Sequence, residues 1–190
     1  MRGHTVFRYA ALASVLVCYA TILIGGNVMA SDAGLACPDW PTCHGTFLPP
    51  LSGGSGIEWA HRLSAVVLSA SIAFMAVAAF LFERGRPVVL RLSLAASSLV
   101  LAQALLGGVV VETDLTVGLV LLHLALATAL FALLLALALL ANFRDIPRRW
   151  IDYAWRASEE TPSSLGRGVD AGAPSTPARR PSDPSARTSG

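Results

Sequence analysis

Long apolar segments alternate with short polar ones along this chain. Four of these segments are apolar on all sides, without the polar stripe of a helix that faces water. They cover about residues 7–28, 57–82, 88–111 and 117–143. Each is long enough to supply the roughly 20 residues that a bilayer-spanning helix needs. The pattern predicts an all-α integral membrane protein, a four-helix bundle within residues 1–150.

The first apolar segment also has features of a secretory signal. Arg2 and Arg8 precede it, and small residues follow it near Ala30. Its apolar run is longer than the usual core of a signal, and three more spans follow. We therefore expect this segment to stay in the membrane as a helix.

The charged residues predict an orientation in the membrane. Hydrophobic residues make up 54% of the chain, and its net charge is +2. Arginines precede the first segment, surround the connection between the second and third segments, and follow the fourth segment; they are Arg2, Arg8, Arg84, Arg86, Arg91, Arg144, Arg148 and Arg149. The two remaining connections contain no arginine or lysine. By the positive-inside rule, both termini of this multi-pass cell-membrane protein are expected in the cytoplasm.

The C-terminal segment and the distribution of basic residues add little to the predicted chemistry. Residues 151–190 are rich in Ser, Pro, Gly, Ala and Arg, so we expect a disordered cytoplasmic tail. No basic cluster is interleaved with aromatic residues, so the positive charge does not indicate a nucleic-acid partner. The expected surroundings are the lipid bilayer.

An internal repeat links the two halves of the bundle. The first segment ends on Gly25-Gly26 followed by Asp32, and the third ends on Gly107-Gly108 followed by Asp114. Each end is followed by an outer loop and then by a helix with a histidine near its start. The sequence thus predicts two repeated helical hairpins, related by an axis along the membrane normal. Glycine pairs that merely let helices pack closely are the simpler interpretation, and the two are compatible.

Two histidines suggest a bound metal. His61 and His123 each lie about one to two turns inside the outer end of an apolar segment. One histidine from each of two helices, facing at equal depth, is the arrangement that axial ligation of a haem iron requires. A histidine hydrogen-bonded to another helix is the more common role for a residue like His123 taken alone. The matching repeat position favours ligation by the pair.

Three polar residues accompany the histidines. Glu58 lies one turn from His61 on the same helix face, and ionisable groups at the edge of hydrocarbon are costly unless they are used. Glu58 is therefore the candidate catalytic group, for moving protons or stabilising charge, although it could simply cap the helix. Arg62 is expected to pair with Glu58 or with a haem propionate. Gln103 is expected to bond across the bundle or to touch the porphyrin.

The cysteines lie in two different environments. Cys37 and Cys43 fall in an outer loop bent by prolines, where a disulfide is within reach and the compartment permits one. Free thiols, or zinc binding together with His44, are the alternatives, and no convincing fourth zinc ligand is found. Cys18 lies inside the first segment and is expected to be a small apolar filler.

Taken together, these motifs resemble the haem A synthase (CtaA) family of cytochrome oxidase assembly. The resemblance rests on Gly34-Leu35-Ala36-Cys37-Pro38-Asp39-Trp40-Pro41-Thr42-Cys43-His44-Gly45, Glu58-x-x-His61-Arg62, Gln103-x-x-x-Gly107-Gly108 and His123. It spans about residues 7–143. The usual member has eight helices in two four-helix halves, and this chain resembles one half.

The resemblance implies a function and a set of ligands. It implies oxidation of a methyl group of the substrate haem O to the formyl group of haem A, with haem b as cofactor. Family roles then fall on Cys37, Cys43, Glu58, His61 and His123. Many relatives carry an arginine shortly after the first glycine pair, where this sequence has Met29.

The resemblance also implies partners. Because one bundle offers one histidine pair, we expect a homodimer or pairing with a second half. Haem O synthase, oxidase subunits and a thiol-redox protein are further possible partners. Two other functions remain open on the sequence: a small b-type cytochrome for electron transfer, and a non-enzymatic haem-handling protein of oxidase assembly.

Overall fold

The computed structural model describes residues 2–49 and 51–143, so the segment predicted to be a disordered tail, residues 151–190, lies outside them. The described part of the chain contains helices and no strands. The helices are α1 (Arg2–Ala30), α2 (Gly53–Phe82), α3 (Pro87–Glu112) and α4 (Val117–Asn142). The predicted all-α class is confirmed.

All four helices are long and apolar enough to cross a membrane. The shortest have 26 residues, which corresponds to about 39 Å at the rise of an α-helix. The hydrocarbon core of a bilayer is only about 30 Å thick. Large apolar side chains such as Leu16, Val66 and Leu94 are more than half exposed along the helices, as expected where lipid covers the surface. The chain is therefore a multi-pass membrane bundle.

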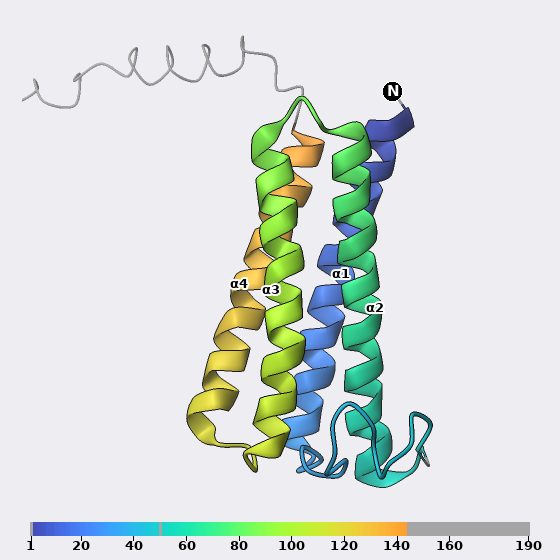
Figure 1. The fold of residues 1–190 in the computed structure, drawn as a ribbon, viewed down its shortest axis with the longest axis vertical. Helices are drawn as coiled ribbons and strands as arrows, with labels where there is room; N and C mark the ends of the chain where they lie inside the picture. The colour runs from blue at the N-terminus through green and yellow to red at the C-terminus, as the bar shows by residue number, and fades with distance from the viewer. Residues whose placement is uncertain (1, 50, 144–190) are drawn as a thin grey trace, which may run out of the picture. The chain divides into compact units, whose positions relative to one another are not determined.

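The helices form an antiparallel ring. α1 packs against α2 and α4, and α3 packs against the same two helices. The N-terminus and the α2–α3 turn lie at one end of the bundle (Figure 1). The long α1–α2 loop, residues 31–52, and the short α3–α4 turn lie at the other end, which we call the loop end.

Two helices begin earlier than the apolar pattern predicts. α1 starts at Arg2 rather than near residue 7, and α2 starts at Gly53 rather than Ile57. The first turn of α2 is rich in glycine, which by itself disfavours a helix. It packs closely on the preceding loop: a Cβ added to Gly54 would lie 3.0 Å from Cβ of Ala36. The Ser55 hydroxyl also donates to the Ala36 carbonyl at 3.1 Å, so tertiary contacts extend this helix.

The ends of α1 and α3 share one geometry, as the repeat suggests. The N–H of Ala33 donates to the Val28 carbonyl at 3.0 Å, and the N–H of Leu115 donates to the Val110 carbonyl at 2.9 Å. The residue before each donor, Asp32 or Asp114, has a φ of 50°. Aspartate tolerates this left-handed conformation better than most residues. Both helices therefore end in the same kind of cap after their glycine pairs.

The packed core occupies the half of the bundle away from the loop end. Its largest fully buried side chains come from all four helices and include Phe7, Ile72, Met75, Val89, Leu130, Leu134 and Leu137. Buried Glu83, in the α2–α3 turn, contacts His4 of α1 and Arg86, and Arg86 donates to the Leu140 carbonyl of α4 at 2.8 Å. This half is closed by apolar packing and by a charged cluster at its end.

Candidate functional site

The half of the bundle near the loop end contains a cavity of about 990 Å³. This volume is at the top of the range of roughly 300–1,000 Å³ that is usual for ligand pockets. All four helices contribute to its walls, and Trp40, Pro41 and Phe47 of the long loop also line it. The five predicted haem-site residues all line the cavity: Glu58, His61, Arg62, Gln103 and His123.

The two histidines enter this cavity from different helices. His61 comes from α2 and His123 from α4, and both rings are partly buried. Nδ1 of each ring is buried without a hydrogen-bond partner among the described residues. The backbone of Thr21 lies beside the His61 ring. Two imidazoles that line one apolar cavity from different helices fit the requirement for a bound metalloporphyrin.

The repeated glycines lie against these imidazoles. A Cβ added to Gly25 of α1 would lie 2.8 Å from Cε1 of His61, and one added to Gly107 of α3 would lie 3.4 Å from Cε1 of His123. The first glycine of each pair thus faces the histidine of the other helix in its hairpin. Gly26 has open space at its Cβ position. The sequence pattern pointed to close helix packing, and the structure adds that the packing partner is the histidine ring.

Gln103 of α3 bridges to the helix that carries His123. Its Nε2 donates to the His123 backbone carbonyl at 2.9 Å. The side chain is buried, with only 7% of the residue exposed. Its Oε1 atom has no hydrogen-bond partner among the described residues. The expected bond across the bundle is therefore present, and one polar atom of the same amide remains unpaired.

Glu58 is buried at the cavity rim with both carboxylate oxygens engaged. Its Oε1 accepts from Arg62 Nη2 at 2.5 Å, and its Oε2 accepts from the backbone N–H of Cys37 at 2.7 Å. The residue is 3% exposed. A buried carboxylate is tolerable when it is paired and hydrogen-bonded in this way. The expected pairing of Glu58 with Arg62 is present.

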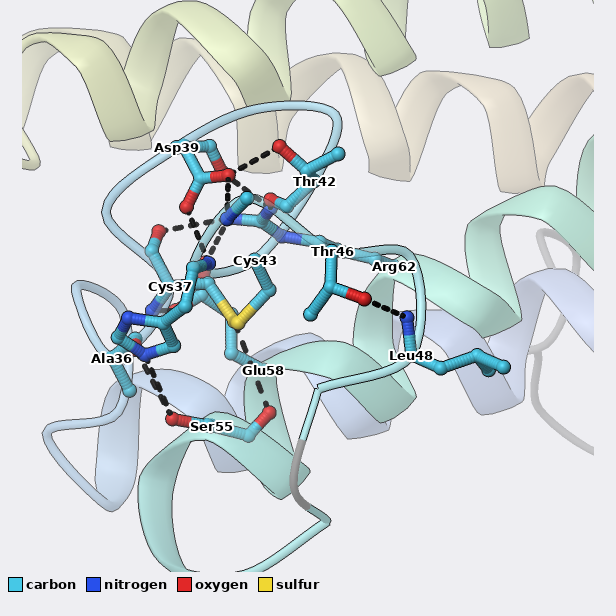
Figure 2. Close-up of a disulfide and its surroundings, with 12 residues drawn as sticks. Ala36, Cys37, Asp39, Thr42, Cys43, Thr46, Leu48, Ser55, Glu58 and Arg62 are labelled. Atoms are coloured by element: carbon cyan, nitrogen blue, oxygen red, sulfur yellow. Dashed lines mark hydrogen bonds and ion pairs between the residues drawn. A yellow bond between two sulfur atoms is a disulfide. The ribbon is translucent and has the colours of Figure 1, made fainter.

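Arg62 anchors the long loop to α2. Besides Glu58, it donates to the backbone carbonyls of Asp39, Thr42 and Cys37 (Figure 2). A guanidinium has four N–H groups on its two terminal nitrogens, and four acceptors of this chain match them. A bidentate contact with a propionate, the other predicted role for Arg62, would have to displace some of these bonds.

The loop itself is closed by a disulfide between Cys37 and Cys43, which the sequence favoured (Figure 2). Both cysteines are fully buried. Their sulfurs are joined to each other, so they are not available as zinc ligands. Trp40, between them, lies against α3, because a Cβ added to Gly108 would lie 2.9 Å from its ring. The disulfide loop thus covers the cavity at the loop end of the bundle.

Asp39 is a feature of this loop that the sequence analysis missed. Its carboxylate accepts from the Thr42 hydroxyl and from the N–H groups of His44 and Gly45. The Thr42 hydroxyl and the Gly45 N–H hold the pKa of Asp39 below its usual value. An aspartate followed three residues later by threonine is a local signal for such a turn. Asp39 and Thr42 have this spacing, but the same spacing is common in loops and therefore did not identify this turn.

Comparison with known proteins identifies the family of this chain. The model of the family described as "COX15-CtaA: Cytochrome oxidase assembly protein" matches residues 8–55 and 53–159. The chain belongs to this family. The match includes α1 from residue 8 onward, the other three described helices and the disulfide loop, so the COX15-CtaA assignment covers the whole cavity.

Individual relatives agree with the COX15-CtaA assignment. "Heme A synthase" of Geobacillus kaustophilus is 35% identical over 159 residues, covering 83% of this chain and 50% of that protein. "Heme A synthase" of Geobacillus thermodenitrificans is 33% identical over 157 residues, covering 83% and 49%. That of Bacillus pumilus is 36% identical over 124 residues, covering 63% and 40%. The chain spans about half the length of the curated relatives it matches.

Proposed function

We propose that this protein binds haem between His61 and His123 and acts as a haem A synthase-type oxidoreductase in cytochrome oxidase assembly. The observation that carries the proposal is the pair of imidazoles from α2 and α4. They line one apolar cavity and enter it from two different helices. The relatives named "Heme A synthase" support the reaction class.

The proposed reaction oxidises a porphyrin methyl group of haem O to a formyl group. The methyl carbon loses two hydrogens and gains one oxygen, with dioxygen as the oxidant: R–CH3 + O2 → R–CHO + H2O. Bound iron supplies the redox chemistry. The chain supplies two imidazole ligands, an apolar enclosure that excludes water, and a carboxylate at the rim.

Glu58 is the proposed catalytic residue. It lines the cavity, and it sits one helical turn from His61. Each carboxylate oxygen has a lone pair beyond the one used by Arg62 or by Cys37. Glu58 can therefore accept a proton from the substrate edge while its hydrogen bonds hold it in place. Arg62 positions it and keeps the disulfide loop over the cavity.

Haem b as a resident cofactor, in addition to the haem O substrate, requires a second site. His61 and His123 form one pair facing one cavity, so we propose that the second haem is held by another copy of this bundle or by a related half. The termini and the α2–α3 turn are proposed to face the cytoplasm, which places the disulfide loop outside. Haem O synthase, oxidase subunits and a thiol-redox protein remain proposed partners.

The test is the identity of the haem in membranes that contain the protein. A strain that makes haem O but lacks haem A synthesis would be given this chain, and extracted porphyrins would be separated and identified by mass spectrometry. The proposal predicts the appearance of haem A. Persistent haem O alone, with a bis-histidine haem spectrum in the purified protein, would instead support the electron-carrier alternative. Persistent haem O with only transient haem binding would support the haem-handling alternative.

A further inference from the structure

The unpaired oxygen of Gln103 is the feature of the cavity that the proposed chemistry does not use. Gln103 is more than nine-tenths buried and lines the cavity, and its Oε1 has no partner among the described residues. Leaving a buried acceptor unpaired costs free energy. Such an atom in a ligand cavity indicates that the ligand supplies the missing donor.

The direction of the amide is fixed by its neighbour. Nε2 donates to the His123 carbonyl at 2.9 Å, and turning the amide over would place two acceptor oxygens against each other. Oε1 is therefore the free end. Nδ1 of His123 also lacks a partner, so these two atoms do not bond each other. A donor carried by the ligand would satisfy Oε1.

Three other polar side chains of the cavity already have hydrogen-bond partners. Glu58 and Arg62 are bonded to each other and to the disulfide loop. The Thr21 hydroxyl, which lines the wall formed by α1, donates to the carbonyls of Val17 and Ser64. Among the described side-chain oxygens of residues that line the cavity, Oε1 of Gln103 is the one without a hydrogen-bond partner.

We propose that Oε1 of Gln103 accepts a hydrogen bond from a hydroxyl group carried on the edge of the bound porphyrin. The inference rests on the proposed function and specifies its substrate. Haem O carries a hydroxyethyl-type side chain where haem b carries a vinyl group, and a vinyl group cannot donate. A site built to bond a hydroxyl discriminates against an analogue that lacks it, because its own polar atom is then left unpaired. Gln103 is therefore a specificity-determining residue of this cavity.

The test measures relative affinity for three iron porphyrins, without turnover. The full chain, purified in detergent and freed of haem, is titrated with iron haematoporphyrin, in which hydroxyethyl groups replace the vinyls. It is also titrated with the methyl ether of that compound and with iron protoporphyrin IX, and binding is followed at the Soret band. For the wild-type chain, we expect the hydroxyl form to bind about threefold to tenfold more tightly than its methyl ether, the usual range for one hydrogen bond.

Substitutions distinguish recognition of the hydroxyl group from packing of the Gln103 side chain. In Gln103→Met, which keeps the length of the side chain and removes the acceptor, we expect the ratio between the hydroxyl form and its ether to fall to about one. Thr21→Val is the matched control, because Thr21 lines the same cavity but its hydroxyl is already committed. We expect this control to keep the wild-type ratio.

The outcomes distinguish this inference from the proposed function. Equal affinity of the wild-type chain for the hydroxyl form and the ether would overturn the role of Gln103, while haem binding itself would stand. A Gln103→Met chain that weakens all three porphyrins equally would also overturn it, because the amide would then only join α3 to α4. If no porphyrin gives a Soret band, the proposed function fails and this inference fails with it.

Discussion

The backbone N–H of Cys37 donates a 2.7 Å hydrogen bond to Oε2 of Glu58. This bond joins one half-cystine of the loop to the candidate catalytic carboxylate, which is also paired with Arg62. Arg62 in turn binds three loop carbonyls. The disulfide loop and the start of α2 therefore form one connected unit, and a change in either is expected to reach the other.

Glu58→Gln tests the proposed catalytic role. The amide keeps the shape of the side chain but lacks the charge and cannot take up a proton from the substrate. We expect conversion of haem O to fall at least about 100-fold, the lower range for loss of a general acid or base, with haem still bound. The readout is the haem A to haem O ratio in extracted porphyrin.

Glu83→Gln is the matched control for that experiment. Glu83 is equally buried and paired with an arginine, but it lies at the opposite end of the bundle. We expect it to lower stability without changing the haem ratio. Near-normal conversion by Glu58→Gln would show that Glu58 is not the catalytic group.

Reduction of the disulfide is expected to loosen the loop without unfolding the bundle. Cys37 and Cys43 are six residues apart, and closing so short a loop is worth about 2 kcal/mol. After treatment with a reductant, amide hydrogen exchange should rise in peptides covering residues 37–46 and stay low in α3. In the Cys18→Ala chain, which keeps the disulfide, the reductant should have the same effect. Unchanged exchange in the reduced loop would mean that Arg62 and Asp39 suffice to hold it.

The glycines that face the histidines predict a graded series of alanine variants. Gly25→Ala brings a methyl group within 2.8 Å of His61, so the ring has to move. Such overpacking typically costs about 1–3 kcal/mol. Gly107→Ala reaches only 3.4 Å from His123, and Gly26→Ala meets nothing within 4 Å. Haem affinity is expected to fall most in Gly25→Ala, less in Gly107→Ala and not in Gly26→Ala; a reversed order would contradict the placement of the rings.

The lowered pKa of Asp39 predicts acid sensitivity of the disulfide loop. A carboxyl group whose pKa is depressed by folding stabilises the fold fully above its unfolded value of about 3.9. That stabilisation is lost as the pH falls through the lower folded value. We expect hydrogen exchange at the amides of His44 and Gly45, corrected for intrinsic rates, to rise below about pH 4. The Asp39→Asn chain should not show this pH dependence, and an identical rise in that chain would assign the effect to another group.

The apolar pattern was sufficient to predict the fold because a lipid-facing helix is apolar along its whole length. It identified all four helices and missed mainly their starts. The glycine-rich first turn of α2 resembles a loop in sequence, and its helical form depends on contact of Gly54 with Ala36. Such a contact depends on the path of the loop, which the pattern does not encode.

The sequence predicted the parts of the candidate site that recur along the chain. It did not predict the contacts between α2 and the disulfide loop. The glycine pairs and histidines recur along the sequence, and the structure brings both histidines to one cavity. The hydrogen bonds of Arg62 to three loop carbonyls could not be inferred, because backbone acceptors leave no mark in the sequence. The free oxygen of Gln103 was likewise visible only once its Nε2 had been placed on α4.

The most direct test of the account is the absorption and electron paramagnetic resonance spectrum of the purified, haem-loaded chain and of its His61→Ala and His123→Ala variants. His44→Asn, a substitution in the exposed loop at a left-handed position that asparagine tolerates, is the control. The account predicts a low-spin bis-histidine haem in the wild-type and control chains, and loss of that signature in each of the other two variants. An unchanged low-spin spectrum in His61→Ala or His123→Ala would contradict it, as would a wild-type chain that binds no haem.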